Sequence, residues 1–585
     1  MKNFSFVLFV LFLLCPVCVT LGKTLPDQFN NKDVRGWIIL SDDMNAAIQT
    51  IKAAKEYDIN QLQLSHEIIH DLREIKTEKV CAQVNELVNL AHSEGINEVL
   101  LWDHSLYDID YYPERFRTGP GGTIDLDNTE FWEWLKDDYR QMLDRVSEAD
   151  GLVLTFIETG AYAERQFSKK MKSSEEKLAA VVNAISDVLI GERKKKLYIR
   201  TFAYSEEEYK GTTGCIEYLK YDEVILMMKE TPHDFFLTHP DNYYIQKMDR
   251  PVIVEFDLGN EYSGQGVVAN TWPEHVMKRW NSYIHCPNVT GYVARTDRYG
   301  NTSIVNTANA IQLYALKRMT EDPKISVDRV YNEFIESEYG NTALLPIKKA
   351  FQKAFDIVTS VFYTLGTNLT DHSSLNYENN KWGYSRHVSG RWIDPPVVRV
   401  EHDVNRTFHY WQDIVNHIAP VQFKSWFSPS FVEVKEVFDR RWMDVGEKMD
   451  SLYYRYIVTE KRYGVRLAAE ALSEIEKTKP VLDSVAYNEL QQLFYRTYLT
   501  ASLHEAVCTA YYGIRIYTGD KKSYPKMLKE DILSALERIT LTVNEMEQMR
   551  GSYPIGQYNW LNDARTALWY RDKIKRMLYL SLIHI

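Results

Sequence analysis

The sequence predicts an α/β protein, a (β/α)8 barrel followed by an all-helical C-terminal domain. After residue 33, short apolar strands alternate with amphipathic helices, which is typical of a parallel sheet covered by helices. Eight such units fit into residues 33–322, which matches a (β/α)8 barrel in number and length. From about residue 325 the strand signals stop and long helical patterns follow, so we expect the helical domain over 325–580.

The expected strands are short runs rich in β-branched and aliphatic residues between turn signals. The segments between them carry apolar residues at spacings of three and four, as in MNAAIQTIKAAKEY, which predicts amphipathic helices. The eight expected strands span 35–40, 59–65, 97–104, 151–156, 196–202, 223–230, 250–258 and 289–297.

The C-terminal part is expected to be helical because of runs such as VDRVYNEFIESEY and LPIKKAFQKAFDIVTSVFYTL. Between its helices lies an irregular stretch near 370–400 that contains Trp382, Tyr384 and Trp392. Irregular stretches of this length are usually functional or disordered. Because the aromatic side chains argue against disorder, we expect a loop that folds back over another part of the molecule.

The N-terminus has the features of a signal peptide over residues 1–22. Lys2 precedes an apolar run from Phe4 to Leu14, and Thr20 and Gly22 occupy small-residue cleavage positions. The run is too short to cross roughly 30 Å of hydrocarbon as a relaxed helix. We therefore expect an exported protein, periplasmic or secreted, without a membrane span; an uncleaved anchor is the alternative.

The net charge and the cysteine spacing argue against nucleic-acid binding and against a bound zinc ion or other cofactor. The formal net charge is −12, and nucleic-acid binding by counterion release needs clustered Lys and Arg, so no nucleic-acid partner is expected. The cysteines beyond the leader lie far apart without CxxC or Cys/His spacing, which predicts neither a zinc site nor another cofactor. They are Cys81, Cys215, Cys286 and Cys508.

Candidate site residues stand at the C-terminal ends of the expected strands, which surround one mouth of a barrel. Several carboxylates and cations around one cavity suit glycoside hydrolysis, which needs one protonated carboxyl and one ionised carboxylate. Each acid taken alone also fits a capping or salt-bridging role. In chain order these residues are Asp103, His104, Glu158, Arg200, Lys229, Asp234, Glu261, Arg295 and Asp297.

Four sequence blocks carry a resemblance to a known family. LTFIETG, YIRTFAY, MMKETPHDF and VEFDLGNEYSGQG occur in this order and resemble the corresponding blocks of the α-glucuronidases of glycoside hydrolase family 67. Those enzymes combine a (β/α)8 barrel with a helical C-terminal domain. The resemblance covers the second half of the barrel well and the helical domain loosely, and the N-terminal β-domain of the family has no counterpart here.

The resemblance implies a role for each matching residue. Glu158 takes the place of the general acid, with a one-residue adjustment of the alignment. Asp234, five residues after Lys229, and Glu261, in an Asn-Glu-Tyr triplet, are the two candidate bases. Arg200 and Lys229 match the cations that bind the substrate carboxylate; the alternative is that they only neutralise the site carboxylates.

Two departures from the family pattern, the N-terminal β-domain without a counterpart and the loss of one Lys, leave the exact sugar open, and with it xylan as the source. A second family Lys, which helps to hold the uronate, falls near Thr155 in this sequence. Glu164 is a second candidate for the acid. Tyr262, Trp102 and His104 are expected to contact the sugar, although a buried core position explains Trp102 equally well.

The expected function is that of an exo-acting glycosidase that releases a terminal α-linked uronic acid from plant or algal acidic oligosaccharides. Inversion follows if acid and base lie roughly 6.5–9.5 Å apart. A glycosidase of the same barrel type for another sugar, or a non-catalytic exported glycan-binding protein, are the alternatives, and retention of all three carboxylates favours an enzyme. The expected partner is an oligosaccharide or polysaccharide; a homodimer stays open.

Overall fold

A computed structural model of the 585-residue chain gives the architecture. The predicted signal peptide over 1–22 and the aromatic residues Trp382, Tyr384 and Trp392 lie outside the described residues. The structure describes residues 32–202, 206–232, 234–237, 241–364, 367–368, 370–375, 451–519 and 526–583.

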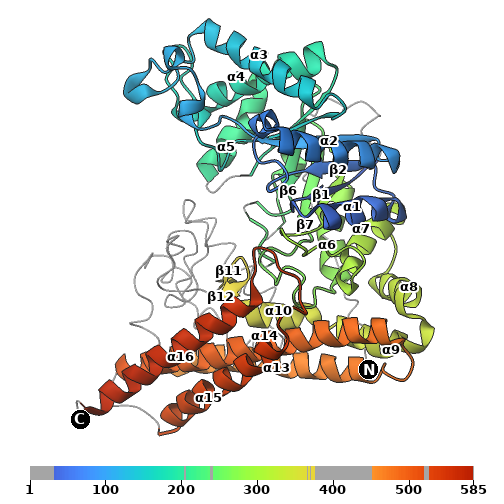
Figure 1. Ribbon diagram of the computed structural model, residues 1–585, viewed down its shortest axis with the longest axis vertical. Coiled ribbons are helices and arrows are strands. Elements are labelled where there is room, and N and C mark those ends of the chain that lie inside the picture. The colour runs from blue at the N-terminus through green and yellow to red at the C-terminus, as the bar shows by residue number, and fades with distance from the viewer. Residues whose placement is uncertain are drawn as a thin grey trace, which may run out of the picture.

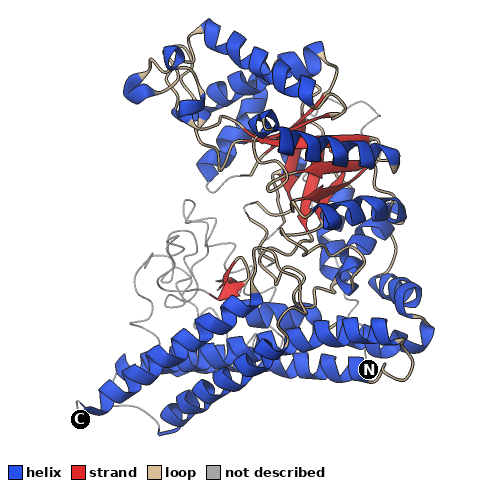
Figure 2. Ribbon diagram, in the orientation of Figure 1, coloured by secondary structure: helices blue, strands red, loops and turns tan. Residues whose placement is uncertain are grey.

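Eight parallel strands form a closed barrel in sequence order, with β1 pairing β8 to complete it. The predicted fold class is therefore confirmed, and the strands lie inside a shell of helices (Figure 2). The strands are β1 (Val34–Ile39), β2 (Gln61–Leu64), β3 (Glu98–His104), β4 (Gly151–Thr155), β5 (Lys196–Arg200), β6 (Ile225–Lys229), β7 (Val252–Asp257) and β8 (Val289–Arg295).

Helices follow the strands, with one exception. Between β6 and β7 the described residues contain only a short 3-10 helix, Ile245–Lys247, and no α-helix. Pro232 and Pro240 in this connection disfavour a continuous helix. The α-helices of the barrel are α1 (Met44–Ala53), α2 (Glu78–Ser93), α3 (Thr129–Arg145), α4 (Ser174–Ser186), α5 (Glu206–Gly214), α6 (Pro273–Ile284) and α7 (Ile311–Glu321).

The period-two alternation of each strand decides which side chains face the barrel interior. Trp102, Tyr198, Met227, Ile253 and Val293 belong to one interior cluster with residues of β1, β3 and β4. The next residues in the same phase lie at the C-terminal ends of the strands and face the mouth. They are His104, Thr155, Arg200, Lys229, Glu255, Asp257 and Arg295.

The C-terminal region of the described chain is mainly helical and lies below the barrel in Figure 1. Helix α14 packs against α13, α15 and α16, and a second apolar core that includes Leu503 and Trp560 fills this layer. The helices are α8 (Val327–Tyr339), α9 (Leu344–Phe351), α10 (Ala354–Phe362), α13 (Ser451–Glu476), α14 (Ser484–Gly519), α15 (Lys526–Gln548) and α16 (Trp560–Ile583).

The helical layer contacts the loop that follows β7. Arg496 Nε donates to the carbonyl of Val267 (2.8 Å), and the amide of Ala269 donates to Thr497 Oγ1 (2.9 Å). This loop carries Glu261, so the C-terminal helices support one side of the barrel mouth. Among the described helices, none combines the length and apolar character that crossing a bilayer requires.

Candidate active site

The barrel mouth consists of two unlike halves. The ends of β5–β8 and their loops carry Arg200, Lys229, Glu255, Arg295 and further ionisable residues, and we call this side the charged half. The ends of β1–β4 form the other side, which we call the histidine half. It is defined by His66, His70, His104, Asp71 and Glu158.

A buried carboxylate lies at the base of the charged half. Glu255 on β7 is 0% exposed, and its Oε2 accepts from Arg200 Nε (2.7 Å) while its Oε1 accepts from Arg295 Nε (3.1 Å). Burial alone would raise the pKa of Glu255, but the charges of Arg200, Arg295 and Lys229 outweigh burial and lower that pKa. Glu255 is therefore an ionised counter-charge shared by two guanidinium groups.

A sharp turn after β7 delivers Glu261 to the mouth. Asn260 adopts a left-handed backbone (φ 58°), which Asn tolerates better than most residues. A Cβ on Gly259 would lie 2.3 Å from the carbonyl oxygen of Asp297, so this position requires glycine. Asp257 Oδ2 accepts from the amide of Glu261 (2.7 Å) and fixes the turn.

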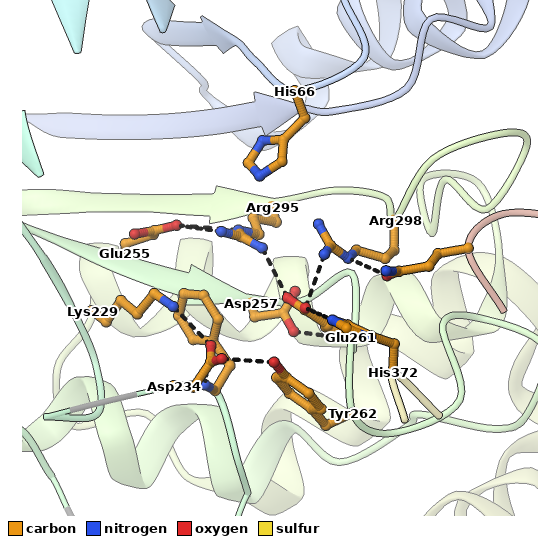
Figure 3. A network of polar contacts seen from close by, with 12 residues as sticks. His66, Lys229, Asp234, Glu255, Asp257, Glu261, Tyr262, Arg295, Arg298 and His372 are labelled. Atoms are coloured by element: carbon orange, nitrogen blue, oxygen red, sulfur yellow. Dashed lines mark hydrogen bonds and ion pairs between the residues drawn. The ribbon is translucent and has the colours of Figure 1, made fainter. Parts of the chain in front are cut away.

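Glu261 is held by cations and by a histidine (Figure 3). Its Oε1 lies 2.9 Å from Arg298 Nη2 and 3.1 Å from His372 Nε2, and its Oε2 lies 3.2 Å from Arg295 Nη1. Burial opposes ionisation, but Arg298 and His372 outweigh burial and hold the pKa of Glu261 well below its usual range. These contacts favour the ionised form of Glu261 and make it a weak base.

Asp234 forms a second anionic centre in the charged half. Its Oδ1 accepts from Lys229 Nζ (2.8 Å) and from the amide of Phe235 (3.0 Å), and its Oδ2 accepts from Tyr262 Oη (2.6 Å). Burial lowers the pKa of Lys229 to about 8, which leaves the ammonium mainly charged at neutral pH. Lys229 Nζ also lies 3.4 Å from the ring centroid of Phe202.

Two cations of this half keep donors that the described protein does not use. Arg200 gives Nε and Nη2 to Glu255, whereas its Nη1 has no hydrogen-bond partner among the described residues. Within the same part of the chain, Lys229 Nζ donates only to Asp234. Arg200 is 3% and Lys229 4% exposed, and the guanidinium of Arg200 packs over the ring of Trp102 at 4.8 Å.

The histidine half contains a stacked pair of imidazoles. His104 Nδ1 lies 2.7 Å from the carbonyl of His70 and therefore carries its proton there, and the two rings stack at 3.7 Å with an interplanar angle of 7°. Burial lowers the pKa of His104 to about 4, so His104 is neutral. Burial opposes the charge on His70, but the hydrogen bond and charge of Asp71 outweigh it and raise the pKa of His70.

His70, Asp71 and His104 are also the group, among the described residues, whose metal-ligating atoms lie within 4.8 Å of one another. Both Nδ1 atoms are already bonded, that of His70 to Asp71 Oδ1 (2.8 Å). Two parallel rings 3.7 Å apart share no point that lies in both ring planes, where an imidazole binds a metal. The arrangement does not fit a single ion; it fits a hydrogen-bonded His–Asp pair.

Glu158 lies three residues beyond β4 with its side chain exposed and its backbone left-handed (φ 62°). Such a conformation is unfavourable for a residue other than glycine and clusters at functional sites. Its charge raises the pKa of His70, which places Glu158 in the histidine half. Nearby, Thr155 is buried, and its Oγ1 has no hydrogen-bond partner in the described chain.

The structure divides the predicted site residues between the two halves. Arg200, Lys229, Asp234, Glu261 and Tyr262 meet in the charged half, whereas Glu158 and His104 lie in the histidine half and Trp102 lies between the halves, over Arg200. The catalytic and binding roles of these residues stay predictions.

Three other predicted positions have different surroundings. Asp103 turns its carboxylate to Tyr107, Tyr139 and the amide of Leu72, which fixes loops rather than facing the mouth. Asp297 accepts from the amides of Leu40 (3.2 Å) and Tyr299 (3.1 Å). Glu164 lies in a 3-10 helix, Ala163–Arg165, and its carbonyl accepts from Lys177.

Sequence reasoning missed five members of the network, among them Asp257, which accepts from the amide of Glu261. Glu255 was detectable, because its place in β7 is in phase with the interior residue Ile253. Two other residues lie just beyond the strands, Arg298 three residues after β8 and His66 two residues after β2. Finding them required the first residues after each strand to be considered as well. In Figure 3 the ring of His66 points toward Arg295 and Arg298. His372 gave no signal, because it comes from a segment remote in sequence.

Neither a protein-family model nor a curated protein matches the sequence. Among solved structures, the chain is similar to a GH138 enzyme targeting pectin rhamnogalacturonan II, with a TM-score of 0.59 and 11% identity over 95% of this chain and 70% of that chain. An O-GlcNAc hydrolase of Thermobaculum terrenum aligns with a TM-score of 0.43 and 9% identity over 92% of this chain and 94% of that chain. The first likeness shows that the chain shares the barrel fold of a glycoside hydrolase.

Proposed function

We propose that the protein is a glycoside hydrolase that releases a terminal uronic acid from an acidic oligosaccharide. One observation carries the proposal: within the described part of the chain, Arg200 Nη1 and the remaining N–H groups of Lys229 have no hydrogen-bond acceptor, and they lie beside the anions Asp234 and Glu261 in the mouth of a barrel. Donors of this kind can bind an anionic group of a substrate.

The two cations suit a carboxylate on the sugar. A carboxylate that leaves water must be paired, because burying it alone costs several kcal/mol. Arginine offers a planar pair of donors and lysine a compact second charge. Arg200 ends β5 and Lys229 ends β6, which are neighbouring paired strands, so a single carboxylate can bridge both.

The reaction assigns one acid to each half. Glu158, on the exposed rim of the histidine half, gives a proton to the departing glycosidic oxygen. Asp234 takes a proton from the attacking water and the anomeric configuration inverts. Glu261, whose low pKa makes it a weak base, instead stabilises the positive charge that develops on the sugar ring.

A glycosidase for a neutral sugar is the second candidate. Arg200 already has a bidentate partner in Glu255, Lys229 is paired with Asp234, and Thr155 supplies no third cation. In that case the cations serve only to balance the buried carboxylates. Export by the leader at 1–22 is part of both proposals.

Hydrolysis of a matched pair of substrates tests the proposal. Aldouronic oligosaccharides and the same compounds with the carboxyl group reduced to an alcohol are incubated with the protein and with Glu158→Gln. We expect release of the acidic sugar by the wild type, much less release of the reduced sugar, and a Glu158→Gln rate lower by about 100-fold or more. Equal release of both sugars would favour the second candidate, and no release of either would overturn the assignment as a glycosidase.

A further inference from the structure

We infer that His372, delivered by the C-terminal part of the chain, is a positioning residue for Glu261, acting through its Nε2 donor. The inference rests on the proposed function and extends it, because it makes the C-terminal region a part of the active site. Neither the barrel motifs nor the spacing of charged residues points to this histidine.

His372 and its neighbour hold Glu261 from two sides. His372 Nε2 lies 3.1 Å from Glu261 Oε1, the same oxygen that Arg298 contacts at 2.9 Å. Ser373 Oγ donates to the carbonyl of Glu261 (2.8 Å) and accepts from the amide of Gly264 (2.8 Å). Side chain and main chain of Glu261 are therefore both fixed by one dipeptide.

The ring of His372 also packs against the residue that contacts the second carboxylate. His372 and Tyr262 stack with centroids 5.6 Å apart and an interplanar angle of 23°. Tyr262 Oη donates to Asp234 Oδ2 (2.6 Å), and Asn368 Nδ2 donates to the carbonyl of Tyr262. Both carboxylates of the charged half thus depend on the same segment, although only Glu261 receives the Nε2 hydrogen bond.

The C-terminal layer anchors this segment. The carbonyl of His372 accepts from Gln265 Nε2 (3.0 Å), and Gln265 Oε1 accepts from the amide of Tyr558 (2.8 Å). The amide of Leu375 donates to Asp563 Oδ1 on α16 (2.8 Å). A residue of α16 is thereby linked to the segment that carries His372.

The backbone of the segment is strained, which these anchors explain. His372 (φ 44°) and Ser373 (φ 74°) are consecutive left-handed residues, and neither is glycine. Each such residue is disfavoured by about 1–3 kcal/mol and persists only where the surroundings fix it. The strain is consistent with a segment shaped to bring an imidazole to Glu261.

Loss of the donor should change the charge balance around Glu261. The ionisable groups that face Glu261 are Arg295 from β8, Arg298 beyond it, Asp257 from β7, Asp234 and His372. Without the His372 hydrogen bond, Glu261 keeps its two guanidinium partners, but its Oε1 is left with Arg298 alone and loses the second of its two side-chain contacts.

Three substitutions of His372 distinguish the role of its Nε2 donor from the role of its ring. Glutamine places its amide nitrogen where His Nε2 lies, whereas asparagine places it near Nδ1, and phenylalanine keeps a ring without a donor. For His372→Gln we expect kcat within about threefold of wild type, and for His372→Asn and His372→Phe a loss of tenfold or more with KM little changed. Equal losses in all three, or wild-type kcat for His372→Phe, would overturn the inference.

A second readout needs no substrate. The acid-unfolding midpoint, followed by tryptophan fluorescence, should move to higher pH for His372→Asn and His372→Phe and move less for His372→Gln, because glutamine restores the hydrogen bond that lowers the pKa of Glu261 but not the charge of the imidazolium. Identical midpoints in all variants would also count against the inference. An inactive wild type with the expected midpoint shifts would overturn the proposed function and leave the role of His372 intact.

Discussion

The charged half and the histidine half of the mouth are ends of the same barrel, yet they differ in how many of their polar groups are held as buried ion pairs. In the charged half, Glu255, Glu261 and Asp234 each contact at least one cation. In the histidine half, His104 is neutral and Glu158 is exposed to solvent. The carboxylates of the charged half are therefore neutralised by cations within the protein, whereas Glu158 on the rim of the histidine half is exposed to solvent.

Two buried carboxylates make the contrast measurable. Asp103, behind the histidine half, accepts from hydroxyls and a backbone amide, and burial raises its pKa to about 6. Glu261 is equally buried, but Arg298 and His372 lower its pKa. Both carboxylates are buried, so burial does not explain why their pKa values differ. The pKa is lowered where a cation contacts the carboxylate and raised where none does.

The largest effect is expected from Glu255→Gln, which leaves Arg200 and Arg295 without their shared counter-charge. Breaking a buried ion pair in this way costs about 3–5 kcal/mol of unfolding free energy. In the other half, Gln63→Leu removes the acceptor of Trp102 Nε1 (2.9 Å) and should cost about 1–3 kcal/mol. Urea unfolding of both variants checks the comparison, and a Glu255→Gln cost no larger than that of Gln63→Leu would contradict it.

The next effect is a pair of opposite pH dependences. Because the folded pKa of Asp103 lies above its unfolded value, its contribution is full below about pH 4 and is lost as the pH rises through about 6. Because the folded pKa of Glu261 is lowered, its contribution is present above about pH 4.5 and is lost as the pH falls further.

The variants Asp103→Asn and Glu261→Gln, which lack the ionisable carboxyl group, test these two pH dependences of stability. The stability advantage of wild type over Asp103→Asn should shrink by about 1–3 kcal/mol between pH 4 and 7, and its advantage over Glu261→Gln should shrink as the pH falls from about 4.5 to about 3. Urea midpoints across this pH range give both values. Parallel trends for the two variants would mean that the halves do not differ in the way described.

The barrel could be predicted from the sequence because the hydrophobic patterns of its strands and helices are local. Alternation of strand and helix patterns located all eight strands, and the strand ends located Arg200, Lys229 and Asp234. The partners of these residues were less accessible. That Arg200 reaches Glu255 depends on the register of three adjacent strands and on side-chain reach, which periodicity does not encode.

Contacts from distant segments were beyond sequence reasoning. His372 and Gln557 belong to no motif, and they meet Glu261 and Arg298 only because the C-terminal helices fold against the loop after β7. The connection between β6 and β7, by contrast, was readable in principle, since its prolines disfavour the helix that the barrel pattern suggests there.

The central claim is that the unused donors of the charged half bind a carboxylate on the sugar, and Arg200→Met with Arg295→Met as its matched control tests it. Both arginines contact Glu255, but the bonds of Arg295 go to Glu255 and Glu261, whereas Arg200 keeps Nη1 unused within the described chain. The measurement is kcat/KM on an acidic glycoside and on the same glycoside with its carboxyl reduced to an alcohol.

For Arg200→Met we expect the ratio of kcat/KM on the acidic glycoside to kcat/KM on the reduced glycoside to fall by about tenfold, or about 1.4 kcal/mol. The loss is limited because Lys229 still binds the carboxylate. For Arg295→Met both values should fall together and the ratio should stay near that of the wild type. An unchanged ratio in Arg200→Met, with parallel losses on the two substrates, would contradict the claim and reduce Arg200 to a counter-charge for Glu255.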